Sequence, residues 1–294
     1  MKKEPLSSAP IVVGIDDSAH GFTVAQAAGS LASALDRSLV LVHAVSDPPT
    51  FPYGDPETRE LQRRQAIEQA ERLLSRVAEA LPTCSVRPTV RLGDNKAALA
   101  AVAQEEEAAL LVIGSSGRGP LAAARTGGVV ATLGAQTRLP VMVVPRGVSD
   151  ALAAASPIGS IVCGLNDSPE SLHALEIARA LAPPLGLELI PVFADRERRP
   201  KDVGGVVAEF GSARGAIKRV VARRNGRLIV VGSRGRGPFA GALLGSVSGA
   251  LAHSATVPVV IAPPGARGDG LIHSPAGAAL AGSNDAAEDL RAAA

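Results

Sequence analysis

Aromatic side chains are almost absent from this chain of 294 residues, which has five Phe, one Tyr and no Trp. Proteins that stack on single-stranded nucleic acid, or that anchor at a membrane interface, depend on aromatic rings. Charge of one sign is also lacking, because 30 Lys and Arg face 28 Asp and Glu and leave a net charge of +2. We therefore expect no nucleic-acid partner.

Cysteine and long apolar runs are scarce as well. Cys84 and Cys163 form neither a disulfide framework nor a CxxC metal motif, which is typical of a reducing compartment. The start, MKKEPLSSAP, places Glu4 and Pro5 where a signal peptide needs an apolar run, and no stretch approaches the roughly 18 apolar residues of a membrane span. We therefore expect a cytoplasmic protein without a membrane partner.

The sequence instead contains an internal repeat. Residues 11–18 read IVVGIDDS and residues 161–168 read IVCGLNDS, while residues 111–122 read LVIGSSGRGPLA and residues 229–240 read IVVGSRGRGPFA. The offset between the copies falls from 150 (11 to 161) to 118 (111 to 229), so the second copy has lost a segment.

Each copy alternates β-branched runs with helical periods, which is typical of a parallel sheet with crossover helices. The first copy predicts strands near 10–15, 38–45, 86–92, 109–114 and 140–144, with helices around residues 24–35, 57–81, 95–106 and 128–137. The second predicts strands near 159–164, 187–193, 206–210, 227–232 and 258–262, with helices near 169–182, 212–225 and 246–254.

The second copy has no helix to match residues 57–81. Residues 195–205, DRERRPKDVGG, are too few and too rich in charge, Pro and Gly to supply one. One face of that sheet should be partly uncovered. We predict a first domain over 1–148, a linker over 149–158, a shortened second domain over 159–265 and a disordered tail over 266–294.

Glycines follow the fourth strand of each copy at a repeated spacing. The second copy places Gly232 and Gly235, then nine residues, then Gly245 and Ser246 at a predicted helix start. Such glycines let backbone amides converge on a phosphate, and a helix start adds a favourable dipole. The alternative is a simple turn. A Walker A loop does not occur, and the GxGxxA matches at residues 117–122 and 235–240 follow the wrong strand for dinucleotide binding.

The paired IVxGxxDS openings, the GSxGRGP segments, the GS before the last helix and the PVxVxP ending resemble the universal stress protein family in its tandem form, over about 10–146 and 158–264. The resemblance implies two tandem, open-twisted, five-stranded parallel-sheet α/β domains of the Rossmann-like, adenine-nucleotide alpha-hydrolase type. The last strands, residues 141–144 and 257–261, would join them as a pseudo-dimer.

The resemblance also implies a site for ATP, ADP or AMP, with Mg²⁺ as a candidate companion. The second site would use Asn166, Asp167, Val192, Gly232, Gly235, Gly245, Ser246 and Val247, and the first would use Asp16, Asp17, Ala44, Gly114, Gly117, Gly127, Gly128 and Val129. Gly128 departs from the family by lacking a hydroxyl, and Asn166 departs by lacking a charge.

Residues that could perform chemistry are few, and we assign no catalytic residue. His43 could be a base, but its expected counterpart, Pro191, favours a packing role. Asp16 and Asp17 could hold Mg²⁺, whereas Asp17 with Ser18 could instead cap the first helix. We interpret Asp17 as a cap and leave Asp16 open.

The leading hypothesis is an ATP-binding stress-response protein, nonenzymatic or very slow as an ATPase, whose nucleotide occupancy is read by an unknown protein partner. The alternatives are an ATP hydrolase or phosphotransfer enzyme, and a dimerisation module with vestigial pockets. A homodimer of the tandem unit is a further expectation.

Overall fold

The computed structural model describes residues 9–47, 55–81, 84–115, 122–148, 159–166, 168–194, 205–233, 244–266 and 271, without the side chains of 122–128 and 131. The predicted site residues Gly117, Asp167 and Gly235 lie outside these ranges. The whole of the predicted linker and most of the predicted tail also lie outside these ranges. Two residues of the tail are described, Ala266 and Leu271, and both are buried.

The first half alternates strands and helices as the repeat predicts. Its elements are β1 (Ile11–Gly14), α1 (Ala19–Ala34), β2 (Leu39–Val45), α2 (Pro56–Glu79), β3 (Val86–Leu92), α3 (Asn95–Glu105), β4 (Leu110–Gly114), α4 (Ala122–Thr137) and β5 (Val141–Val144). One boundary was wrong: α4 begins at Ala122, six residues before the predicted start.

The second half repeats the pattern in shortened form. Its elements are β6 (Ser160–Leu165), α5 (Pro169–Leu185), β7 (Glu188–Phe193), β8 (Val207–Ala208), α6 (Ala213–Arg223), β9 (Gly226–Gly232), α7 (Ser246–Ser254) and β10 (Val259–Ala262). β8 has two residues, fewer than predicted, because it pairs with β7 only at Val207 and Ala208.

All ten strands form one sheet in the order β3-β2-β1-β4-β5-β10-β9-β6-β7-β8. Neighbours are parallel except at the centre, where β5 and β10 run antiparallel with Val143 opposite Val259 and Val141 opposite Ile261. The predicted association of the two halves through their last strands is confirmed. We call this β5–β10 pairing the seam.

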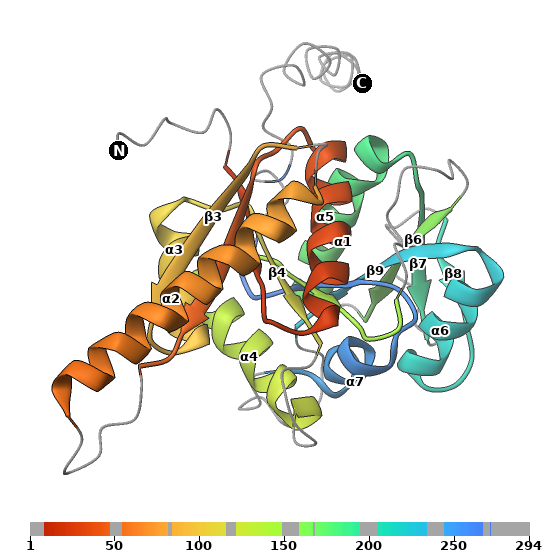
Figure 1. Cartoon of the computed structure of the whole chain (residues 1–294). Helices are drawn as coiled ribbons and strands as arrows, with labels where there is room; N and C mark the ends of the chain where they lie inside the picture. The colour runs from red at the N-terminus through yellow and green to blue at the C-terminus, as the bar shows by residue number, and fades with distance from the viewer. Residues whose placement is uncertain are drawn as a thin grey trace, which may run out of the picture.

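Helices cover both faces of the sheet, so the molecule has three layers (Figure 1). α1, α2 and α5 pack on one face around residues such as Leu31, Leu41 and Ile161. α3, α4, α6 and α7 pack on the other, around Leu133 and Val162 among others. Each strand contributes alternate residues to the two cores, and this accounts for the near-continuous apolar runs in the strands.

The face that α2 covers in the first half has no equivalent cover in the second. Among the described residues no helix lies between β7 and β8. Strand register makes Leu189 the counterpart of Leu39, because they pair with the equivalent residues Ile161 and Ile11. Leu39 is fully buried and Leu189 is only half-buried, as the missing helix predicts.

Short polar side chains begin most helices. Asp55 accepts hydrogen bonds from two amides of α2, whose first residue is Pro56, and Asp94 does the same for α3. Ser168 and Ser212 cap α5 and α6. These caps satisfy amides that have no acceptor within the helix. In the described part of the chain, no helix combines the length and the apolar character that crossing a membrane requires.

Candidate functional site

The carboxyl ends of the central strands of each half meet at one edge of the sheet. In the first half β1 lies between β2 and β4, and α1 and α4 leave the sheet on opposite faces. β6 lies between β7 and β9 in the same way. This divergence of two neighbouring crossovers is the switch point at which open α/β sheets bind ligands. Because the seam is antiparallel, the two candidate sites lie at opposite edges of the sheet.

The turn after the first strand of each half is built around an Asx side chain. Asp16 Oδ1 accepts hydrogen bonds from the Ser18 amide at 3.2 Å and the Ser18 hydroxyl at 2.5 Å. Asn166 Oδ1 accepts from the Ser168 amide at 3.2 Å. The N-cap of α1 is Ser18, as expected, and Asp16 contacts it, while the interpretation of Asp17 as a cap stays a prediction. An amide oxygen serves the turn as well as a carboxylate does.

A groove of about 1110 Å³ lies between the end of β2 and α2. Asp17, His43 and Ala44 line it together with residues of α2, so two predicted residues of the first site share one surface. His43 Nδ1 lies 2.8 Å from the Ile15 carbonyl oxygen. Since a carbonyl only accepts, Nδ1 carries the proton in this contact. The contact orients the imidazole and leaves Nε2 for other partners.

Strand register changes which residues of β7 correspond to those of β2. Gly14 pairs with Val42 and its repeat counterpart Gly164 pairs with Val192, so Val192 is equivalent to Val42. The equivalent of Ala44 is therefore Ala194, which the sequence analysis missed. By the same register, His43 corresponds to Phe193 and not to Pro191.

The glycines that end β4 and β9 are required for packing against the opening turns of α1 and α5. A Cβ on Gly114 would lie 3.0 Å from His20 Cδ2, and one on Gly232 would lie 2.8 Å from the carbonyl carbon of Glu170. His20 Nε2 also lies 3.0 Å from the Val144 carbonyl oxygen. Both glycines let a helix start approach the end of a strand closely, a role that a phosphate loop also needs.

The start of α7 fits anion binding. The helix begins at Ser246, as predicted, and its N-cap is Gly245, which supplies no side-chain hydrogen bond. The Gly245 amide donates to the Ser233 carbonyl at 2.7 Å, which ties the helix start to the end of β9. The first amides of the helix, at Ser246 and Val247, have no acceptor within it and lie at the positive end of its dipole.

The first half differs at the corresponding place. Because α4 begins at Ala122, Gly127, Gly128 and Val129 lie beyond its first turn. Amides at those positions of an α-helix donate to carbonyls four residues earlier. The prediction that Gly127 and Gly128 present a helix start was therefore wrong.

The two thiols are protected rather than reactive. Burial raises the pKa of Cys163 to about 12, with a smaller opposing effect from Arg179, and burial also raises the pKa of Cys84. Among the described residues, no group of three His, Cys, Asp or Glu could hold a metal ion.

A ten-stranded sheet built from two similar halves, each with a glycine turn at the carboxyl edge, defines a tandem Rossmann-like α/β protein. The model of the universal stress protein family matches residues 8–145 and 193–263. The chain belongs to this family, which confirms the resemblance in its sequence.

Several known proteins match this chain over nearly their whole length. Universal stress protein Rv2005c of Mycobacterium tuberculosis is 30% identical, over 88% of this chain and 98% of the relative. Universal stress protein Rv1996 of the same organism is 27% identical, over 86% and 94%. The crystal structure of a universal stress protein from Archaeoglobus fulgidus shares the fold with a TM-score of 0.68 and 19% identity, over 87% of this chain and 98% of that one.

Proposed function

We propose that this protein binds an adenine nucleotide, ATP, ADP or AMP, at the carboxyl edge of its second half. The observation that carries the proposal is the start of α7, where Gly245 supplies no side-chain cap and the turn at Gly232 and Ser233 lies alongside. α2, α3, α5 and α6 have a capping side chain, whereas α1 and α7 begin without one. Of these two, α7 is tied through its N-cap Gly245 to the residue after the glycine that ends β9, and an uncapped start there favours an anionic ligand. The phosphates would contact the amides of Ser246 and Val247 and the Ser246 hydroxyl.

The nucleoside would extend from α7 toward β6 and β7. Asn166 closes the turn after β6, and Ala194 follows β7 at the place that Ala44 holds in the first half. Small side chains there leave room for a flat base without an aromatic partner. Asn166 offers polar atoms to the sugar without the charge repulsion that a carboxylate would exert on phosphates.

The first half is the weaker candidate for a triphosphate. Its groove, with Asp17 and Ala44, has the volume for a nucleoside, because ligand pockets commonly measure about 300 to 1,000 Å³. Its glycine pair, however, lies inside α4. A nucleotide bound there would lack the helix-start amides that favour phosphates in the second half.

The same geometry supports a regulatory protein rather than an efficient hydrolase. Asp16, the candidate ligand for Mg²⁺, uses one carboxylate oxygen for the turn with Ser18. Nucleotide occupancy would then alter a surface that a protein partner reads. An ATP hydrolase that uses Asp16 and Mg²⁺, and a dimerisation module with vestigial pockets, are the competing functions.

Calorimetric titration with ATP, ADP and AMP, with and without Mg²⁺, tests the proposal. Ser246→Asp places a negative charge where the phosphates would bind, while an Asp in the first turn favours the helix itself, so the variant should fold. Asp17→Ala in the first half is the matched control. We expect wild-type protein and Asp17→Ala to bind ATP, and Ser246→Asp to lose at least tenfold in affinity.

Each competing result has a distinct meaning. Loss of binding in Asp17→Ala with retention in Ser246→Asp would move the site to the first half. No binding of any nucleotide at millimolar concentration would overturn the proposal. Phosphate release that depends on Mg²⁺ and disappears in Asp16→Ala would favour the hydrolase.

A further inference from the structure

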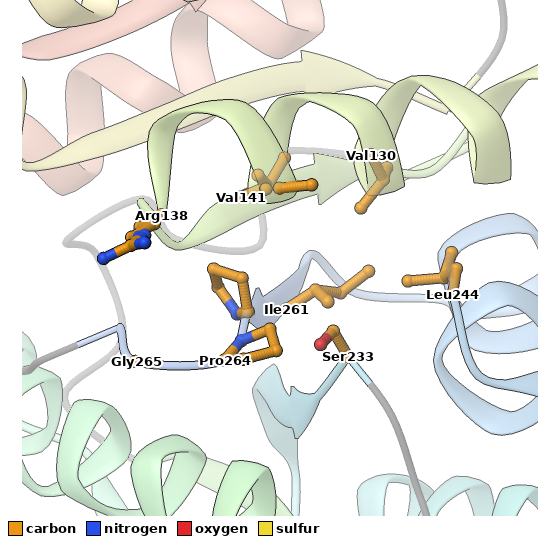
Figure 2. Close-up of a pocket in the computed structure, with 11 residues that line it drawn as sticks. Val130, Arg138, Val141, Ser233, Leu244, Ile261, Pro264 and Gly265 are labelled. Atoms are coloured by element: carbon orange, nitrogen blue, oxygen red, sulfur yellow. The ribbon is translucent and has the colours of Figure 1, made fainter. Parts of the chain in front are cut away.

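A cavity of about 470 Å³ lies where the two halves meet, between the carboxyl-terminal part of α4 and the turn after β10. Figure 2 shows Val130 and Val141 of the first half on one wall and Ser233, Ile261 and Pro264 of the second half on the facing wall. Val130, Val141 and Ile261 are almost fully buried. The cavity therefore has apolar walls and a volume suited to a small organic molecule.

Ser233 lines this cavity and carries an unsatisfied, buried hydroxyl. The residue is only 6% exposed, and its Oγ has no hydrogen-bond partner among the described residues. Buried hydroxyls are nearly always paired, because an unpaired one carries the full cost of its desolvation.

The first half shows why the hydroxyl is unpaired. Ser115 is the repeat counterpart of Ser233, and its Oγ accepts a hydrogen bond from the Arg146 amide at 3.1 Å. The counterpart of Arg146 is Pro264, which has no amide hydrogen. The two turns otherwise match, since Gly147 and Gly265 follow at φ 76° and 75°.

Arg138 supplies a charge at the end of the cavity opposite Leu244 (Figure 2). The side chain is exposed, and its guanidinium makes no ion pair or hydrogen bond with the described residues. Arg138 adopts a left-handed backbone conformation, with φ 56°, directly after α4. A guanidinium in this position is suited to a carboxylate.

We propose that this cavity binds a small amphipathic carboxylic acid whose apolar body carries a second hydrogen-bonding group. The carboxylate would pair with Arg138, the body would contact Val130, Val141 and Ile261, and the second group would satisfy the Ser233 hydroxyl. The cavity adjoins the proposed phosphate position, because Ser233 and Leu244 flank the start of α7, but it lies on the β10 side of β9, whereas Asn166 follows β6 on the other side.

Three related probes separate the two polar contacts. para-Hydroxyphenylacetate has both polar groups, phenylacetate lacks the hydroxyl, and para-hydroxyphenethyl alcohol lacks the carboxylate. Calorimetry and saturation-transfer NMR should show the first binding most tightly. Loss of either contact should weaken binding by up to about fivefold, the ratio that corresponds to about 1 kcal/mol.

Variants then assign each contact to a residue. Ser233→Ala should remove the advantage of para-hydroxyphenylacetate over phenylacetate only. Arg138→Gln should remove its advantage over the alcohol only. Val130→Phe narrows the cavity at its apolar wall and should weaken the binding of all three probes. Ser246→Asp should leave all three bound, which separates this site from the nucleotide site.

Three outcomes would overturn the proposal. The first is no binding of any probe at millimolar concentration. The second is Ser233→Ala weakening the binding of para-hydroxyphenylacetate and phenylacetate equally. The third is binding that Val130→Phe does not change, with circular dichroism confirming that the variant is folded. Should Val130→Phe not fold, the separate effects expected of Ser233→Ala and Arg138→Gln still decide the matter.

Discussion

Ser115 and Ser233 end equivalent strands, yet replacing each by alanine should change the free energy of unfolding in opposite directions. Ser115→Ala removes the hydroxyl that accepts a hydrogen bond from the Arg146 amide, and Ser115 is only 4% exposed. Losing this partly buried hydrogen bond costs about 1 kcal/mol. Ser233→Ala removes a hydroxyl that has no partner in the described part of the chain, so stability should stay constant or rise by up to about 1 kcal/mol.

Pro264→Ala supplies the test within the second half. Alanine restores the amide that Arg146 provides in the first half, and the new hydrogen bond to Ser233 is worth about 1 kcal/mol. Losing the proline also makes the unfolded chain more flexible, which offsets about 0.4 to 1 kcal/mol of that gain. The free energy of unfolding of the single variant should therefore be close to that of the wild type. In the Pro264→Ala background, Ser233→Ala should then cost about 1 kcal/mol. The difference between this cost and the effect of Ser233→Ala in the wild-type protein is the coupling free energy that tests the reasoning.

Urea unfolding followed by far-UV circular dichroism measures the three single variants and the double variant. The m values should stay constant, so that midpoint shifts report stability. The reasoning fails if Ser233→Ala destabilises the protein as much as Ser115→Ala does. It also fails if the coupling between Ser233→Ala and Pro264→Ala is zero.

Three further predictions concern the core and the first turn. The pKa of Cys163, raised from 9.0 to about 12 by burial, means that the unfolded state releases its proton first. Stability should therefore fall by about 1.4 kcal/mol per pH unit above about pH 9, and urea unfolding of Cys163→Ala should lack this component. Gly164→Ala should cost about 1 to 3 kcal/mol in thermal unfolding, because its Cβ would lie 2.7 Å from Ile217 Cδ1, and Ile217→Val should recover part of the loss. Asp16→Asn should stay within about 0.5 kcal/mol of wild type in urea unfolding, whereas Asp16→Ala should lose about 1 kcal/mol.

Each has a result that contradicts it. An unchanged pH dependence in Cys163→Ala would show that other groups set the alkaline slope. Equal stability of Gly164→Ala with and without Ile217→Val would place the strain elsewhere. If Asp16→Asn is as unstable as Asp16→Ala, then the charge of the carboxylate, and not its oxygen as a hydrogen-bond acceptor, supports the turn.

The repeat and its periods were sufficient to predict the order of elements, because each strand and helix buries a complete apolar face. Composition also predicted the missing helix, since residues 195–205 have no such face. The seam followed from two apolar last strands that would otherwise be bare edges. Each of these features depends on the hydrophobic pattern, which can be read from the sequence alone.

Features that depend on register or on a single backbone atom were harder to predict. The start of α4 was missed because Gly127 and Gly128 are poor helix formers that the tertiary structure nevertheless places inside the helix. The sequence interpretation misaligned β7 by two positions, so Val192 was chosen in place of Ala194. The cavity at Ser233 depends on the missing amide of Pro264, a signal that is readable only by comparing the two turns residue by residue.

The seam also has an evolutionary consequence. In a homodimer every substitution occurs in both subunits, so a defect at the interface is carried twice. Joining two copies in one chain holds the partners at a fixed effective concentration and lets each change alone. Three such one-sided differences are Asn166 for Asp16, Pro264 for Arg146 and, among the described residues, the lack of a helix equivalent to α2 in the second half. A single chain with two copies can therefore make the hydrogen bond of Ser115 in one copy and lack its equivalent at Ser233 in the other.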